Sequence, residues 1–145
     1  MRVRCGTFPW CTIGFTGHVM PTVLVVDDNL DIVSAVSEAL TEEGWDVVAV
    51  LSAKEATPAA QSRKIDVVLC DVLLGDGTDG PALRDTFALG GLGQIPFVFV
   101  TASTREVARL GGELVLPKPF AISAVLGILD AAMNGTRMGL RAGEG

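Results

Sequence analysis

Cysteine and histidine are scarce in this chain of 145 residues, which has three cysteines and one histidine. Cys5, Cys11 and Cys70 are odd in number and lack the paired short spacings of a zinc site. His18 has no second histidine that could share a metal ion with it. The sequence therefore indicates neither a disulfide framework nor a structural metal, and we expect a reducing, cytoplasmic location.

Basic clusters and long apolar runs are also missing. The formal net charge is -6 and no group of lysines or arginines stands together, so we expect no direct nucleic-acid partner. Segments that carry charge, glycine or proline interrupt every apolar run before it reaches the length of a membrane span. We therefore expect a soluble protein without a membrane partner. With 49% hydrophobic residues, the chain has room for one domain with a sizeable core.

The ends of the chain differ from its middle. Residues 1–19 show no clear period and precede a second methionine, Met20, so we expect residues 1–20 to be a disordered leader or an upstream start. A secretory signal is the alternative, with Arg2 and Arg4 as its basic region, but glycine, proline and polar residues interrupt the part that should be apolar. Residues 135–145 are rich in glycine and are expected to form a flexible tail, which leaves one domain at residues 21–134.

Four short apolar runs stop on, or just before, residues with reactive or charged side chains. An apolar run of strand length that ends on a carboxylate is typical of a buried parallel strand. Such strands bring their last residues to the carboxyl edge of the sheet, where open α/β folds bind ligands. The four runs are residues 65–71, ending on Asp71; residues 22–26, followed by Asp27 and Asp28; residues 97–100, followed by Thr101; and residues 114–116, before Lys118.

Helical patterns separate these strands. The spacing of apolar residues predicts helices at residues 30–43, 81–89, 104–110 and 122–133, and residues 45–50 form a further strand. Ser52 and Glu55 make a capping-box pattern for another helix, in which Pro58 predicts a kink or a late start. This alternation favours an α/β fold, a doubly wound parallel sheet of five strands in the order 2-1-3-4-5.

The residue types at the strand ends indicate phosphoryl chemistry. Asp27, Asp28 and Asp71 repel one another when packed together, and Mg²⁺ bound through oxygen relieves that repulsion and leaves positions for phosphate oxygens. Asp71 can attack phosphorus to give an aspartyl phosphate, while Lys118 and Thr101 neutralise the equatorial oxygens. Cys70 precedes Asp71 but points to the opposite side of the strand, which predicts a buried core thiol.

These residues together resemble a response-regulator receiver domain of two-component signalling. The matching features are Asp27 and Asp28, Asp71, Thr101 followed by Ala102, and the segment Pro117, Lys118, Pro119, Phe120. The resemblance implies that Asp71 accepts phosphate from a histidine kinase or a phosphotransfer protein. It also implies that Asp28, Asp71 and the backbone carbonyl of Leu73 bind Mg²⁺ directly, with Asp27 helping through the metal or its waters.

Two features depart from the family pattern. Val115 stands three positions before Lys118, where the family usually has an aromatic residue that swings inward on activation. Lys118 follows Thr101 by 17 positions, fewer than in most of the family, so the fourth helix is expected to be short. With residues 96–101 reading PFVFVT, the chain is similar to a subgroup with a Pro-Phe-x-Phe-x-Thr-Gly stretch, although Ala102 replaces its glycine.

The favoured function is a stand-alone phosphoacceptor that switches between partner proteins and is not an enzyme acting on external substrates. Only residues 135–145 follow the last helix, so we expect the output to be another protein. One alternative is a haloacid-dehalogenase-type phosphatase, but there the nucleophile lies on the first strand and the acidic pair comes late, the reverse of the order here. The other is a pseudo-receiver that binds partners without phosphorylation.

Overall fold

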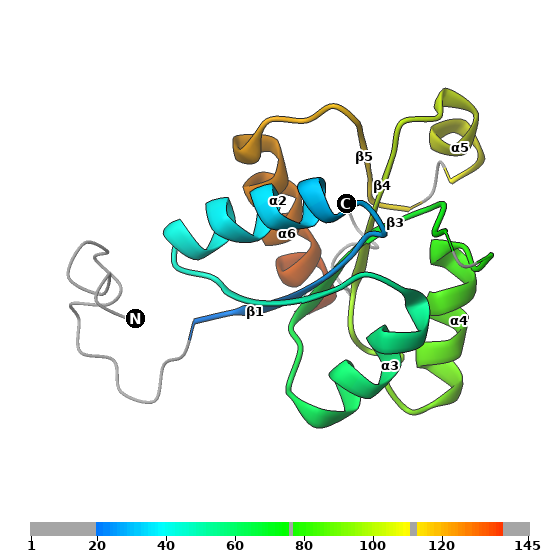
Figure 1. Ribbon diagram of the computed structural model, residues 1–145. Coiled ribbons are helices and arrows are strands. Elements are labelled where there is room, and N and C mark those ends of the chain that lie inside the picture. Colours follow the sequence, from blue (N-terminus) through cyan, green and yellow to red (C-terminus); the bar gives the residue numbers. More distant parts are fainter. Residues whose placement is uncertain (1–19, 76, 111–112, 138–145) are drawn as a thin grey trace.

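Five parallel strands form one sheet in the order β2-β1-β3-β4-β5, which confirms the predicted fold class (Figure 1). The computed structural model describes residues 20–75, 77–110 and 113–137, so the predicted leader up to residue 19 and most of the predicted tail lie outside the described residues. The strands are β1 (Thr22–Val26), β2 (Asp46–Val50), β3 (Val67–Asp71), β4 (Phe97–Thr101) and β5 (Val115–Pro117).

Helices cover both faces of the sheet. They are α2 (Leu30–Glu42), α3 (Ala53–Ser62), α4 (Gly80–Leu89), α5 (Thr104–Arg109) and α6 (Ile122–Arg137). In Figure 1, α2 and α6 lie together on one side of the sheet, and α3 and α4 lie on the other. Among the described residues, no helix is both long and apolar enough to cross a membrane.

Side chains at the helix starts explain where the helices begin. The Asn29 side chain accepts hydrogen bonds from the backbone amides of Asp31 and Ile32, at 2.9 and 3.2 Å. Ser52 accepts from the amide of Glu55 at 3.3 Å, as the capping-box pattern predicted. The Glu55 carboxylate in turn accepts from the amide of Leu51 at 3.2 Å. These two reciprocal hydrogen bonds hold the residues that precede α3 against its first turn.

Several predicted boundaries were wrong, most of them by one or two residues and the end of the last helix by four, since α6 runs to Arg137 and includes the first residues of the predicted tail. The late start predicted for α3 is wrong, since the helix begins at Ala53 and includes Pro58. The capped first turn holds the helix despite the missing amide of Pro58, whereas a kink at this proline stays a prediction. α4 begins at Gly80 rather than Pro81, because Asp79 is its N-cap. The strand starts also shift by one or two residues, to Asp46, Val67 and Val115.

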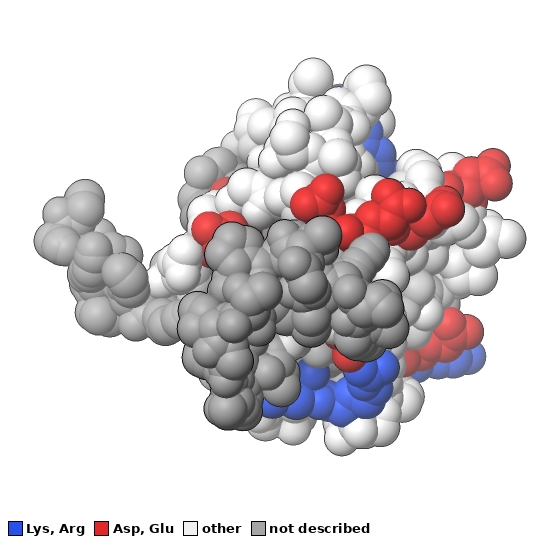
Figure 2. Space-filling model, turned by 90° about the vertical axis from the view of Figure 1, so that its left-hand side faces the viewer, with Lys and Arg blue, Asp and Glu red and all other residues white. Residues whose placement is uncertain are grey.

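On the surface seen in Figure 2, acidic groups form a row, and basic groups gather below it with further acidic groups beside them. Two basic residues that precede β3 have acidic partners. Arg63 lies 2.6 Å from Asp46, and Lys64 lies 3.5 Å from Asp66. Their charges are therefore partly balanced by neighbouring acids.

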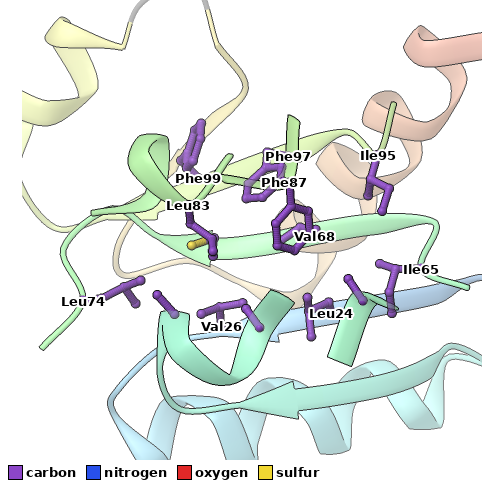
Figure 3. Close-up of a cluster of buried hydrophobic side chains, with 14 of the residues drawn as sticks. Leu24, Val26, Ile65, Val68, Leu74, Leu83, Phe87, Ile95, Phe97 and Phe99 are labelled. Atoms are coloured by element: carbon purple, nitrogen blue, oxygen red, sulfur yellow. The ribbon is translucent and has the colours of Figure 1, made fainter. Parts of the chain in front are cut away.

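The core has two layers, one on each face of the sheet. Figure 3 shows the layer between the sheet and the α3–α4 side, where side chains of the strands meet Leu83 and Phe87 of α4. Phe87 is fully buried, and its ring lies edge-on to Phe97 with the ring centroids 5.2 Å apart. This contact joins the last turn of α4 to β4, so the helix that follows the β3–α4 loop is packed against the sheet.

Phe87→Ala should destabilise the fold by about 3–5 kcal/mol, because it removes a fully buried ring and its edge-on partner contact. Urea unfolding followed by circular dichroism measures the change. Leu89→Ala is the matched control on the same helix: Leu89 is 90% exposed, so its loss should change stability by less than about 0.5 kcal/mol. Equal effects of the two substitutions would contradict the packing described here.

Candidate functional site

Residues from four strands meet at the carboxyl edge of the sheet. Asp71 and Thr101 are the last residues of β3 and β4, Asp27 follows β1 directly, and Lys118 follows β5. The strands are parallel and in close register, with Asp71 opposite Val100 and Thr101 opposite Pro117. The shared edge is a consequence of this register, because parallel strands all end on the same side.

Lys118 joins two of the acidic residues. Its Nζ lies 3.1 Å from Asp27 Oδ2 and 3.3 Å from Asp71 Oδ2. The Lys118 backbone is itself fixed, since its amide donates to the carbonyl of Thr101 at 2.8 Å. One ammonium group therefore bridges the ends of β1 and β3, as expected for residues that act at a common centre.

Burial raises the pKa of Asp71 above its ordinary value, and repulsion from Asp27 raises it further. The charge and hydrogen bond of Lys118, and the backbone amide of Leu73, act in the opposite direction without cancelling the rise. Burial lowers the pKa of Lys118, but its hydrogen bonds and attraction to Asp27 and Asp71 outweigh burial, so the net pKa is raised. Lys118 is therefore positively charged at neutral pH, and it lies beside Asp71, whose ionised form is destabilised by burial.

Three carboxylates are arranged as a group that fits a hard divalent cation. Asp27, Asp28 and Asp71 each offer an oxygen, and these oxygens all lie within 4.8 Å of one another. Mg²⁺ binds oxygen at about 2.1 Å, so two ligand oxygens on opposite sides of one ion are roughly 4 Å apart. The spacing needs little adjustment to hold such an ion, and Asp28 is exposed, which leaves room for coordinating waters.

The remaining predicted residues take different positions. The Thr101 hydroxyl is buried and accepts a hydrogen bond from the Ser103 amide at 3.1 Å. Leu73 is 56% exposed on the loop after β3, and its carbonyl as a metal ligand stays a prediction. Cys70 is fully buried, as predicted, with burial as the main reason that its pKa is raised. Such a thiol is unreactive at neutral pH.

Gly80 is a further residue that supports the site, and the sequence alone did not identify it. Its amide donates to the carbonyl of Val72 at 2.8 Å. A Cβ atom on Gly80 would lie 2.9 Å from the Phe99 ring and 3.0 Å from the backbone oxygen of Asp71. A side chain there would push the start of α4 away from the end of β3. Its position between the N-cap Asp79 and Pro81 was the available sequence signal.

The geometry defines a doubly wound α/β domain with an acidic, lysine-bridged centre at its carboxyl edge. The chain belongs to the response regulator receiver domain family, whose model matches residues 23–134. The particular members that it resembles include the probable transcriptional regulatory protein TcrX of Mycobacterium tuberculosis, with 32% identity over 79% of this chain and 50% of that protein. The transcriptional regulatory protein CpxR of Escherichia coli is 33% identical over 70% of this chain and 44% of its own length.

Solved structures show the same relationship. The chemotaxis protein CheY4 of Vibrio cholerae aligns with a TM-score of 0.70 and 27% identity, over 79% of this chain and 99% of that chain. The receiver domain of the Francisella response regulator 1452 aligns with a TM-score of 0.69 and 25% identity, over 80% and 98% of the two chains. The chain thus matches receiver domains along nearly their whole length, and it spans about half the length of the curated relatives.

Asp71→Asn should stabilise the fold at neutral pH in the absence of divalent cations. Because the folded-state pKa of Asp71 is raised above 3.8, its carboxyl is neutral in both states below that pH and costs nothing there. As pH rises from the unfolded-state pKa to the raised folded-state pKa, Asp71 ionises in the unfolded state first, so the folded state loses stability over this window and the loss is complete above it. We expect the variant to gain on the order of 1 kcal/mol at pH 7, and the gain to vanish below about pH 4.

Urea unfolding in EDTA across a pH series measures this difference. Asp85→Asn is the control, because Asp85 is exposed on α4 and lies outside the acidic group. It should shift stability little at any of these pH values. A variant Asp71→Asn that is no more stable than the wild type at pH 7 would contradict the raised pKa.

Proposed function

We propose that the domain is a phosphoacceptor switch in which Asp71 takes a phosphoryl group from a histidine kinase or a phosphotransfer protein. The observation that carries this proposal is the position of Lys118 Nζ, 3.1 and 3.3 Å from the carboxylates of Asp27 and Asp71. A fixed cation beside a buried carboxylate suits a centre where negative charge accumulates during transfer. Membership of the receiver family supports the same reading.

The transfer forms one bond and breaks one. An oxygen of Asp71 attacks phosphorus, an O–P bond forms, and the N–P bond of the phosphohistidine breaks, so that its electron pair returns to the imidazole nitrogen. Lys118 is placed to neutralise a phosphoryl oxygen, and the Thr101 hydroxyl can donate its hydrogen to another, since it only accepts from Ser103. Mg²⁺ held by Asp27, Asp28 and Asp71 would neutralise further charge on the phosphoryl group.

Phosphorylation is expected to change the loops that follow β3 and β4. It replaces the carboxylate charge of Asp71 by a larger anion beside Lys118, and a group of that size and charge biases the arrangement of the surrounding loops. Val115 lies opposite Phe99 in the β4–β5 register and carries no ring, so an aromatic rotamer at this position cannot report the change. The short helix α5, with six residues, leaves a different surface from that of receivers with a longer fourth helix.

The wider role is also a proposal. We propose that the output is a protein partner and that the domain acts without nucleic acid, in the cytoplasm. The net charge of -6 supports this role, and so do the acidic partners of Arg63 and Lys64. TcrX and CpxR are named transcriptional regulators, and this chain corresponds to about half of each. Membership of the subgroup with the Pro-Phe-x-Phe-x-Thr-Gly stretch stays a prediction.

Incubation with Mg²⁺ and acetyl phosphate, followed by intact mass measurement, tests the proposal. We expect the wild type to gain the mass of one phosphoryl group, and Asp71→Asn to gain none, because it lacks the attacking oxygen. EDTA should prevent the adduct. Asp85→Asn, which changes an exposed aspartate on α4, is the matched control and should be phosphorylated like the wild type.

Other outcomes distinguish the alternatives. Turnover of an external phosphomonoester without a lasting adduct would favour a phosphatase of the haloacid-dehalogenase type. Absence of both an adduct and Mg²⁺ binding would favour a pseudo-receiver. An adduct that persists in Asp71→Asn would place the phosphoryl group on another residue and overturn the assignment of Asp71.

A further inference from the structure

The loop between β3 and α4 brings a glycine against one of the proposed metal ligands. A Cβ atom built on Gly75 would overlap Asp28 Oδ2 and would lie 3.3 Å from Asp28 Cγ. Real Cβ atoms do not approach other atoms this closely, so the carboxylate occupies the space that a side chain at position 75 would need. Asp28 and Gly75 are far apart in the sequence and meet only in the fold.

The position of Gly75 is set by the residues around it. Leu74 is buried in the core layer on the α3–α4 side, with 6% of its surface exposed. Its amide donates to the carbonyl of Thr78 at 3.2 Å, and its carbonyl accepts from the amide of Gly77 at 3.3 Å. Leu73 and Asp79 form an isolated antiparallel bridge across the base of the same loop. The loop is therefore anchored on both sides of Gly75 and cannot simply move away from Asp28.

The Asp28 side chain is the part of this contact that can yield. Asp28 is exposed, so an obstructed carboxylate can rotate into water without loss of buried packing. Its contribution to the acidic group depends on its present orientation, in which its oxygen lies within 4.8 Å of those of Asp27 and Asp71. A side chain at position 75 would therefore cost the fold little, but it would turn one carboxylate out of the group.

We propose that Gly75 is a positioning residue for the divalent cation: its missing side chain leaves the space in which Asp28 turns its carboxylate toward Asp27 and Asp71. This inference rests on the proposed function, since it concerns the same metal centre. The glycine is not needed here for an unusual backbone conformation. Gly77 and Gly91 have positive φ values of 88° and 86°, whereas Gly75 is not among the residues with positive φ.

Gly75→Ala in the full chain tests the inference, with Mg²⁺ binding measured by isothermal titration calorimetry. We expect an affinity lower by roughly tenfold, the usual result when a residue that orients a metal ligand is altered. The melting temperature in EDTA should be equal to that of the wild type or slightly higher, because alanine restricts the unfolded chain more than glycine does. The increase in melting temperature on adding Mg²⁺ should be smaller in the variant.

Gly127→Ala is the matched control. Gly127 lies in α6, and a Cβ atom there would meet no atom within 4 Å apart from the adjacent backbone of its own helix, so this variant should bind Mg²⁺ like the wild type. If Gly75→Ala also binds like the wild type, the inference is wrong while the metal centre stands. If its melting temperature in EDTA falls, the glycine serves the fold rather than the carboxylate, which also overturns the inference. If the wild type binds no Mg²⁺, the proposed metal centre itself fails.

Discussion

The ion pairs of Lys118 with Asp27 and Asp71 are the interaction on which the centre depends. Asp27 and Asp71 are 2% and 8% exposed, and two carboxylates at this depth repel each other unless a cation lies between them. Lys118 supplies that cation at 3.1 and 3.3 Å, from a strand at the far edge of the sheet. The repulsion between Asp27 and Asp71 is therefore offset by Lys118 only when β5, the strand before it, has joined the sheet. Formation of the complete sheet is thus a condition for the centre.

The rest of the fold can be understood as the scaffold for this balance of charge. The three central strands, β1, β3 and β4, are buried along their whole length and are made mainly of apolar residues, so a charged side chain fits there only where a strand ends. The compensation is incomplete, because the pKa of Asp71 stays raised despite Lys118. A centre that leaves part of this repulsion unrelieved is poorly suited to stabilising the protein and well suited to binding a cation or accepting a phosphoryl group.

The sequence allowed most of the fold and of this centre to be predicted, because the informative residues interrupt simple patterns. Asp71 ends an apolar run, and Lys118 stands between two prolines, so both can be found without coordinates. The capping box correctly identified Ser52 as the N-cap of α3, whereas the late start offered as one effect of Pro58 was wrong, because the capped first turn outweighs the missing amide of Pro58. Gly75 could not be recognised, since a glycine in a turn-rich loop resembles any turn glycine. Its significance comes from Asp28, a neighbour that only the three-dimensional structure reveals.

The contacts around Phe99 show how the centre is connected to the face formed by α4 and β5. The ring of Phe99 lies against Gly80 at the start of α4, and the Arg84 guanidinium lies 5.3 Å from the centre of the same ring. Arg84 also pairs with Glu113, just before β5. The start of α4, the ring of Phe99, Arg84 and Glu113 therefore form one continuous set of contacts that extends to the surface. Val115 pairs with Phe99 in the β4–β5 register and has no ring of its own, so the ring of Phe99 is the aromatic group that lies between Gly80 and Arg84.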